Sequence, residues 1–195
     1  MRTTATPLPT TCRVAVAFFV AAVFAALPGP AAAQRFSFEQ SVDVVPGTTL
    51  DIATERGRID VSVGESTRVQ VIGTVTVRAG WDVPPDAVTI ARRVADHPPV
   101  EDETGIIRLR PPMTATERRA VTVSYDVTVP RRTRVVVNSD SGAVTIRDVG
   151  GPVTVSTQSS TIALNQLGAN ADIKTGSGAV RREIDEEVDI PRLDC

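Results

Sequence analysis

Three consecutive stretches near the C-terminus decide the fold: TRVVVNSDSGAVTIRDVG (133–150), GPVTVSTQSSTIALNQLG (151–168) and ANADIKTGSGAVR (169–181). When the three are aligned, similar residues recur every 18 positions. A fixed period with apolar residues in register is typical of stacked, equivalent units. The recurring sets are Gly142, Ser160 and Gly178; Val135, Val153 and Ala171; Val137, Val155 and Ile173; and Val144, Ile162 and Val180.

Each repeat is long enough for two short strands and two turns, since a strand residue advances by about 3.3 Å. A unit this small cannot bury its own apolar face, so its neighbours must cover it. The repeat therefore predicts the rungs of a β-solenoid over 133–181. An antiparallel sandwich with coincidental spacing is the alternative. A fainter copy lies upstream, where Thr54, Gly57 and Ile59 repeat the offsets of Ser139, Gly142 and Val144.

The repeat stops after Val180, where the chain continues as RREIDEE (181–187). The position held by Ile146 and Leu164 is taken by Arg182. Two interpretations of the acidic tail, residues 182–195, stay open. It is a polar cap of the kind that blocks end-to-end growth of a stack, or it is a frayed or truncated end.

Upstream of the repeat, β-branched residues alternate with polar ones. This period of two predicts strands with one buried face around 69–77 and 121–129, and an opening strand around 36–44. The segment 85–96 differs, because PPD (84–86) is a helix start and HPP (97–99) is a stop. We therefore expect an all-β domain over 34–181 with one short inserted helix.

Four segments carry a family resemblance: FSFE (36–39), LDIATERGRIDV (50–61), VTVPRRTRV (127–135) and NSDSGAVTI (138–146). Together with the recurring Gly-x-Val/Ile units, they resemble the bacterial exported family known as putative adhesins, a domain of unknown function with β-solenoid repeats. The resemblance covers residues 36–181. It implies a repetitive β fold and a binding or structural role, and it attaches no catalytic residue. Members of that family usually contain more Gly-x-Val/Ile units than this chain.

The N-terminal segment 1–33 is typical of a secretory signal peptide. Arg2 and Arg13 supply positive charge, an apolar run spans 14–27, and AAA (31–33) offers a cleavage site after Ala33. The run is shorter than the roughly 18–20 residues of a membrane-spanning helix, so a cleaved signal is favoured over a membrane anchor. We expect export to the periplasm, the cell surface or the medium. Cleavage leaves Cys195 without an intrachain partner, so the fold must form without a disulfide.

Composition excludes several kinds of function. The formal net charge of −2 argues against a nucleic-acid binder, which normally has a basic face. One His and two Cys leave too few ligands for a His/Cys metal site. The mature chain, with no second long apolar run, is not expected to span a membrane.

The acidic residues offer two candidate sites. Asp140, Asp148 and Asp172 lie within the repeat but do not share a repeat position, so we expect them in solvent and not in one catalytic groove. The runs EDE (101–103) and DEE (185–187) suggest a calcium site as one alternative, since Ca²⁺ prefers several carboxylate oxygens. Neither run matches an EF-hand loop or the glycine-rich nonapeptide repeat, which favours solvated acidic turns.

The basic and aromatic candidates each have a structural interpretation, and some also have a functional one. The clusters Arg118-Arg119 and Arg131-Arg132-x-Arg134 are predicted at exposed edges or corners, with contact to an anionic envelope polymer as the alternative. His97 is predicted to cap a helix C-terminus. Trp81 is predicted to be a hydrophobic anchor for the helix, with a sugar-stacking platform as the alternative.

We therefore assign no catalytic residue, cofactor site or metal site. The expected function is that of an exported, non-enzymatic envelope or surface protein, a binding or structural module of adhesin-like type. Its expected partner is an envelope polymer, a glycan or a protein. One alternative is a carbohydrate-active enzyme, a polysaccharide lyase or hydrolase on the same scaffold. Another is a degenerate family member without independent activity.

Overall fold

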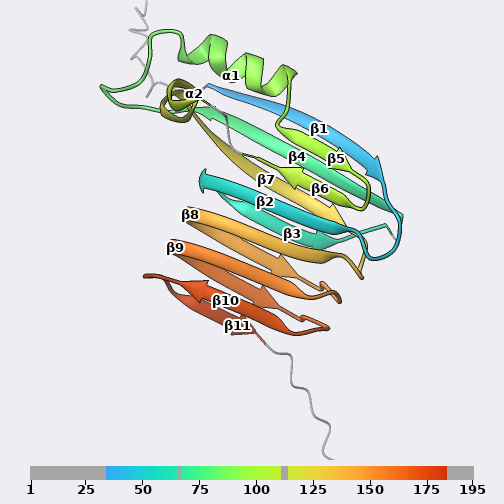
Figure 1. Ribbon diagram of the computed structural model, residues 1–195. Helices are drawn as coiled ribbons and strands as arrows, with labels where there is room; N and C mark the ends of the chain where they lie inside the picture. The colour runs from blue at the N-terminus through green and yellow to red at the C-terminus, as the bar shows by residue number, and fades with distance from the viewer. Residues whose placement is uncertain (1–33, 66, 111–113, 184–195) are drawn as a thin grey trace, which may run out of the picture. The chain divides into compact units, whose positions relative to one another are not determined.

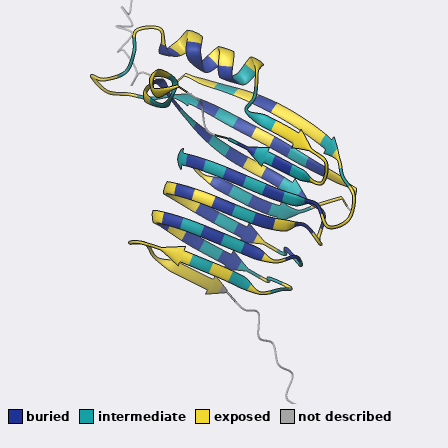
Figure 2. Cartoon of the chain, in the orientation of Figure 1, coloured by how far each residue is buried: buried dark blue, intermediate teal, exposed yellow. Residues whose placement is uncertain are grey.

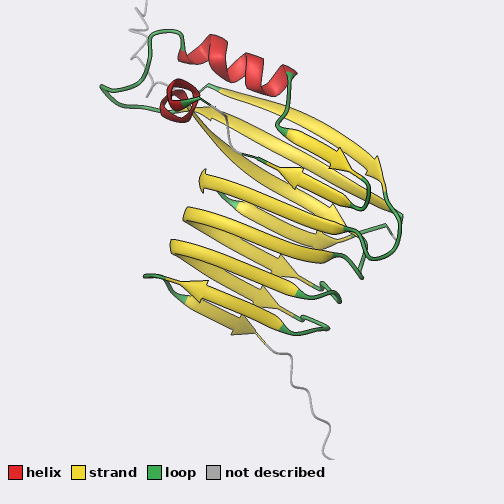
Figure 3. Cartoon of the chain, viewed as in Figure 1, coloured by secondary structure: helices red, strands yellow, loops and turns green. Residues whose placement is uncertain are grey.

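The computed structural model describes residues 34–183, apart from residue 66 and residues 111–113. This part of the chain is mostly β, which confirms the predicted class. Figure 3 shows the strands, with α-helical segments at one end. The expected signal peptide, the run 185–187 and Cys195 lie outside the described residues.

The described strands join in a single hydrogen-bonded sheet. In chain order the elements are β1 (Arg35–Asp43), β2 (Thr49–Arg56), β3 (Ile59–Val63), β4 (Arg68–Val77), α1 (Ala87–Asp96), β5 (Val100–Glu103), β6 (Ile106–Leu109), α2 (Ala115–Ala120), β7 (Val121–Val129), β8 (Arg134–Arg147), β9 (Val153–Asn165), β10 (Ala171–Thr175) and β11 (Val180–Glu183).

The period of the sequence repeat is the register between neighbouring strands. β8 and β9 pair in parallel along their length, with Val135 opposite Val153 and Ile146 opposite Leu164. β10 and β11 pair in parallel with β9 at the same offset, and Arg182 lies opposite Leu164. Because the repeats pair in parallel, the antiparallel alternative is wrong for this part of the chain.

The upstream copy of the repeat is also a neighbour in the sheet. β2 pairs with the first half of β8, which brings Thr54 opposite Ser139. β3 pairs with the second half of β8, which brings Ile59 opposite Val144. The segment from β4 to β7 is therefore inserted, in sequence, between two paired copies of one structural unit. In Figure 1, β2, β8, β9 and β10 form one layer, and β3 and the second halves of β8 and β9 lie behind it.

The core lies between the two layers. Along β8, Val135 and Val137 are buried before the bend and Val144 and Ile146 are buried after it, so the buried face changes from odd to even positions. The change occurs near Gly142, whose φ of 134° is open to glycine but strained for other residues. Figure 2 shows the resulting alternation of buried and less buried residues along β2, β8 and β9.

The inserted segment extends the sheet at the other end. β1, β4 and β7 pair antiparallel, and β7 pairs in parallel with β3. The hairpin of β5 and β6 continues the first layer through parallel pairing of β6 with β2. Tyr125 on β7 is buried, and its ring packs edge to face against Phe38 with the ring centres 6.5 Å apart. Its hydroxyl donates a hydrogen bond to the Arg110 carbonyl at 3.2 Å. Burial raises the pKa of the Tyr125 phenol.

Helix α1 confirms the helix predicted over 85–96. It lies against β4 and β1 and buries Ala87, Ile90, Ala91 and Val94. Helix α2 was not predicted, although its start has a sequence signature. The Thr114 hydroxyl accepts the Glu117 N–H at 3.1 Å, and the Glu117 carboxylate accepts the Thr114 N–H at 3.0 Å, forming a capping box. That backbone hydrogen bond from Thr114 lowers the pKa of Glu117.

Candidate functional site

The outward side of β2, β8, β9 and β10 carries two rows of side chains that cross the strands. We call these eight residues the polar face: Ala53, Asn138, Ser156 and Lys174 in one row, and Asp51, Val136, Thr154 and Asp172 in the other. All eight are exposed or half-buried. Neighbouring strands in a sheet lie about 4.8 Å apart, so each row presents side chains at a constant spacing. Amide, hydroxyl and charged groups dominate both rows.

One edge of the polar face is fixed by ion pairs. Arg110 donates a hydrogen bond to Asp51 Oδ2 at 2.7 Å, and both side chains are half-buried. Arg108, opposite Asp51 on β6, pairs with Glu103 of β5. The other oxygen of Asp51, Oδ1, is buried and has no hydrogen-bond partner among the described residues. Asp51 is paired and half-buried, so it stabilises the edge of the polar face and is less accessible to a ligand than the exposed residues.

A ladder of serines ties the repeats together at the bend. Ser141, Ser159 and Ser177 occupy the same position in consecutive repeats. Each hydroxyl donates to a backbone carbonyl of the preceding copy: that of Glu55 at 3.2 Å, of Asp140 at 3.4 Å and of Gln158 at 3.5 Å, respectively. Sequence reasoning missed this ladder, although its period was visible. The ladder therefore adds side-chain hydrogen bonds between neighbouring copies of the repeat at the bend.

Ser160 occupies the repeat position that holds Gly142 and Gly178, and its hydroxyl is buried without a partner among the described residues. A buried hydroxyl without a hydrogen bond costs desolvation energy. We expect Ser160→Ala to raise the free energy of unfolding by about 1 kcal/mol in urea denaturation. Ser139→Ala is the matched control, because Ser139 is also buried but donates to the Ser141 carbonyl. The control is expected to lose stability, and a loss in both variants would contradict the assignment.

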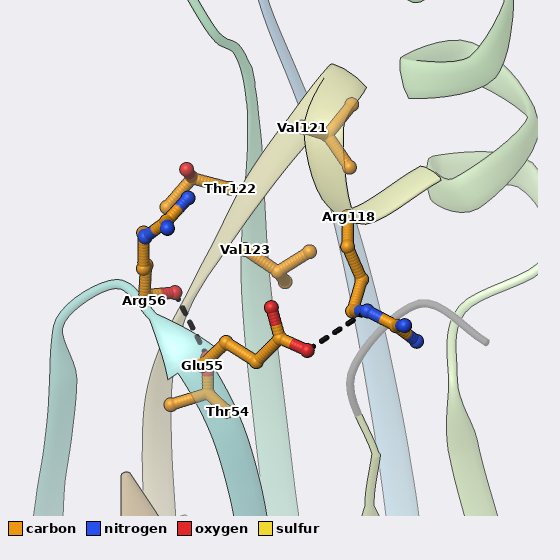
Figure 4. A pocket seen from close by; sticks show the side chains of 7 residues that line it. All are labelled: Thr54, Glu55, Arg56, Arg118, Val121, Thr122 and Val123. Atoms are coloured by element: carbon orange, nitrogen blue, oxygen red, sulfur yellow. Dashed lines mark hydrogen bonds and ion pairs between the residues drawn. The ribbon is translucent and has the colours of Figure 1, made fainter. Parts of the chain in front are cut away.

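A small pocket lies beside the bend between β2 and β3 (Figure 4). Thr54, Glu55 and Arg56 line it from β2, Arg118 lines it from α2, and residues 121–123 line it from β7. The Arg118 Nε lies 2.8 Å from Glu55 Oε1, and these side chains are 37% and 43% exposed. An ion pair so exposed contributes little to stability. Among the described residues that line it, Glu55 is the one carboxylate, and it pairs with Arg118.

The acidic candidates that the structure describes do not come together. The Asp140 carboxylate accepts a hydrogen bond from Gln158 at 3.4 Å, Asp148 lies in the turn after β8 with a φ of 61°, and Asp172 lies 3.9 Å from Lys174. The run 101–103 forms part of strand β5 and not the predicted turn, and alternation along the strand directs Asp102 away from its two neighbours. Among the described residues, no three His, Cys, Asp or Glu side chains gather in a way that could hold a metal ion.

The cluster at 131–134 and His97 lie at their predicted places, whereas Arg118 is half-buried on α2 and pairs with Glu55. Arg131 and Arg132 are exposed in the turn between β7 and β8, and Arg134 is the first residue of β8. Arg119 is exposed on α2. His97 is the C-cap residue of α1, and its backbone N–H donates to the Arg93 carbonyl at 2.9 Å.

The prediction for Trp81 is wrong. This side chain is 99% exposed in the loop between β4 and α1, so it does not anchor the helix. The helix is held instead by its own apolar residues, Ile90, Ala91 and Val94, which are already buried. The Arg92 guanidinium also lies 5.8 Å from the centre of the Phe36 ring on β1, within the range of a cation–π contact. The sugar-stacking alternative for Trp81 stays a prediction.

Comparisons with known proteins give little further information. No family model and no curated protein matches the chain. A solved structure of a putative cell adhesion protein from Clostridium sporogenes is similar over 76% of this chain and 100% of its own, with a TM-score of 0.40 and 10% identity. A likeness of this size does not show a family or a function. In the part of the chain that the structure describes, neither helix is long and apolar enough to cross a membrane.

Proposed function

We propose that this chain is an exported, non-enzymatic binding module of the bacterial envelope, built on a short β-solenoid. In this proposal β2–β3, β8, β9 and β10–β11 are successive coils. The parallel pairing of β8, β9 and β10, each strand in register with the next copy of the repeat, supports the solenoid. The signal-like pattern of residues 1–33 supports export.

The polar face is the observation that carries the binding role. Asn138, Ser156 and Lys174 lie opposite one another on consecutive strands. A linear polymer lying across these strands would meet a hydrogen-bonding side chain at each step. Regular, extended faces of this kind are the surfaces through which solenoid proteins bind their partners. The amides and hydroxyls of the face suit the hydroxyl and amide groups of a cell-wall polymer or glycan, which is therefore the proposed ligand class.

The test is binding of purified protein to a panel of peptidoglycan, teichoic acid, lipopolysaccharide and capsular polysaccharide, with released products measured in the same samples. The double variant Asn138→Ala/Ser156→Ala removes two groups of the polar face. We expect it to bind the recognised polymer about tenfold more weakly, which corresponds to about 1.4 kcal/mol. The matched control is Thr145→Ala/Thr161→Ala, which removes two outward hydroxyls from the second halves of β8 and β9.

Binding without product release, weakened by the polar-face variant and unchanged in the control, would support the proposal. Product release would favour the polysaccharide lyase or hydrolase and would overturn the non-enzymatic role. Equal loss in both double variants would show that the polar face is not the binding surface. Absence of binding to every polymer would contradict the proposal that the ligand is a cell-wall polymer or glycan.

A further inference from the structure

β10 is an edge strand with an open side. It pairs with β9 through residues 171–175, and no described strand lies on its other side. The outer N–H and C=O groups of an edge strand are a template for pairing with another chain. Natural edges prevent such pairing by proline, bulges, short strands or lysine; β10 has no proline and no bulge in its register with β9, but it is only five residues long and carries Lys174.

β11, in the second layer, is protected where β10 is not. Arg182 lies opposite Leu164, at a position that points inward in the preceding strands. An inward charge at an edge opposes further pairing, because an added strand would have to bury it. At the equivalent inward position of β10 lies Ile173, opposite the buried Val155. Of the two strands at this end of the stack, β10 is therefore the one with an apolar inner side.

The sequence of β10 is complementary to itself. If a second copy pairs antiparallel with the two Ile173 residues opposite each other, Asp172 of each copy lies opposite Lys174 of the other. If one strand shifts by two residues in either direction, the two Asp172 residues or the two Lys174 residues lie opposite each other. Cross-strand pairs of opposite charge are stabilising and like pairs are destabilising, so the charges favour one register.

We propose that this chain forms a two-fold dimer by antiparallel pairing of β10 with β10 of a second copy. The two charged side chains are accessible to a partner. Asp172 and Lys174 are 63% and 75% exposed, and their contact within one chain is loose at 3.9 Å. The arrangement is isologous, because the same strand serves both partners. It also joins the polar faces of the two copies into one surface, although the proposal does not depend on the binding role of that face.

The dimer is expected to be weak. One strand of five residues on each side buries far less than the roughly 1,200 Å² of a stable interface. Dissociation in the micromolar range or above is therefore expected, and sedimentation velocity over a concentration series is the suitable measurement. A reducing agent in every sample prevents disulfide crosslinking through Cys195.

Charge reversal provides the decisive test. Asp172→Lys leaves two lysines on each β10, and Lys174→Asp leaves two aspartates, so each variant alone should dimerise at least about tenfold more weakly than the original chain. An equimolar mixture of the two restores opposite charges at both contacts and should form a heterodimer. The double variant Asp172→Lys/Lys174→Asp should also recover dimerisation, because it only exchanges the partners. Asp140→Lys, an exposed reversal away from the edge, is the control and should dimerise like the original chain.

Thermal unfolding of each variant separates folding from association, since both changed side chains are exposed. A full-length chain that stays monomeric at every concentration would overturn the proposal. Single variants that dimerise as well as the original chain, or a mixture that does not recover association, would exclude the proposed register.

Discussion

Replacing Ile162 with aspartate is expected to abolish cooperative folding. Ile162 is fully buried on β9 and lies between Val144 on β8 and Val180 on β11. A carboxylate at this position would be removed from water without any cation to pair with it, because the surrounding core is apolar. The expected loss exceeds about 4 kcal/mol, a large part of the total stability of an ordinary domain. Circular dichroism during thermal unfolding is the measurement.

The neighbouring residue supplies the control for this prediction. Thr161 lies one position earlier on the same strand and is exposed. Thr161→Asp introduces the same charge into the same strand, but on the side that faces solvent. It is expected to change the free energy of unfolding by no more than about 0.5 kcal/mol. Similar unfolding temperatures for the two aspartate variants would refute the inward assignment of Ile162.

The repeat was predictable because β8, β9 and β10 pair in parallel at an offset of one repeat, so the period of the sequence equals the offset between paired residues. Val135, Val153 and Ala171 hold one repeat position, and each lies opposite the next. Even the faint copy around Thr54 and Ile59 indicated its neighbour correctly, although it pairs with β8, which lies beyond the whole inserted segment in sequence. A local pattern could predict pairing between distant segments because copies of one unit must bury the same positions.

The features that escaped prediction depend on pairing between unlike segments. The contact of Arg110 with Asp51 joins residues 59 positions apart that share no repeat position. Helix α2 is short, so its apolar pattern is weak, and only the Thr114–Glu117 capping box marked it. Trp81 was misplaced because an aromatic residue next to a helix suggests burial, whereas the loop between β4 and α1 directs it outward. The polar face could be located only once the register of four strands was known.

The bend of β8 at Gly142 leaves no room for a side chain. Its φ is 134°, and a Cβ added there would overlap the carbonyl oxygen of Gly57 in the neighbouring copy. Gly142→Ala therefore combines backbone strain with a clash against main-chain atoms that the sheet holds in place. We expect a loss of about 4 kcal/mol or more in urea denaturation, with the two layers of β8 unable to keep their present bend.

Gly47 is the control that separates backbone strain from the steric clash. It also has a positive φ, 90°, but no heavy atom lies within 4 Å of an added Cβ. Gly47→Ala therefore tests strain alone and is expected to cost about 1–2 kcal/mol. Ser160, which holds the equivalent position one repeat later, keeps its side chain because its φ is not positive. Glycine is therefore needed at the bend of β8 and also at Gly57, which has a φ of 131° and where an added Cβ would overlap the Val123 carbonyl oxygen. Equal losses in Gly47→Ala and Gly142→Ala would show that the close approach of the two backbones at Gly142 contributes nothing.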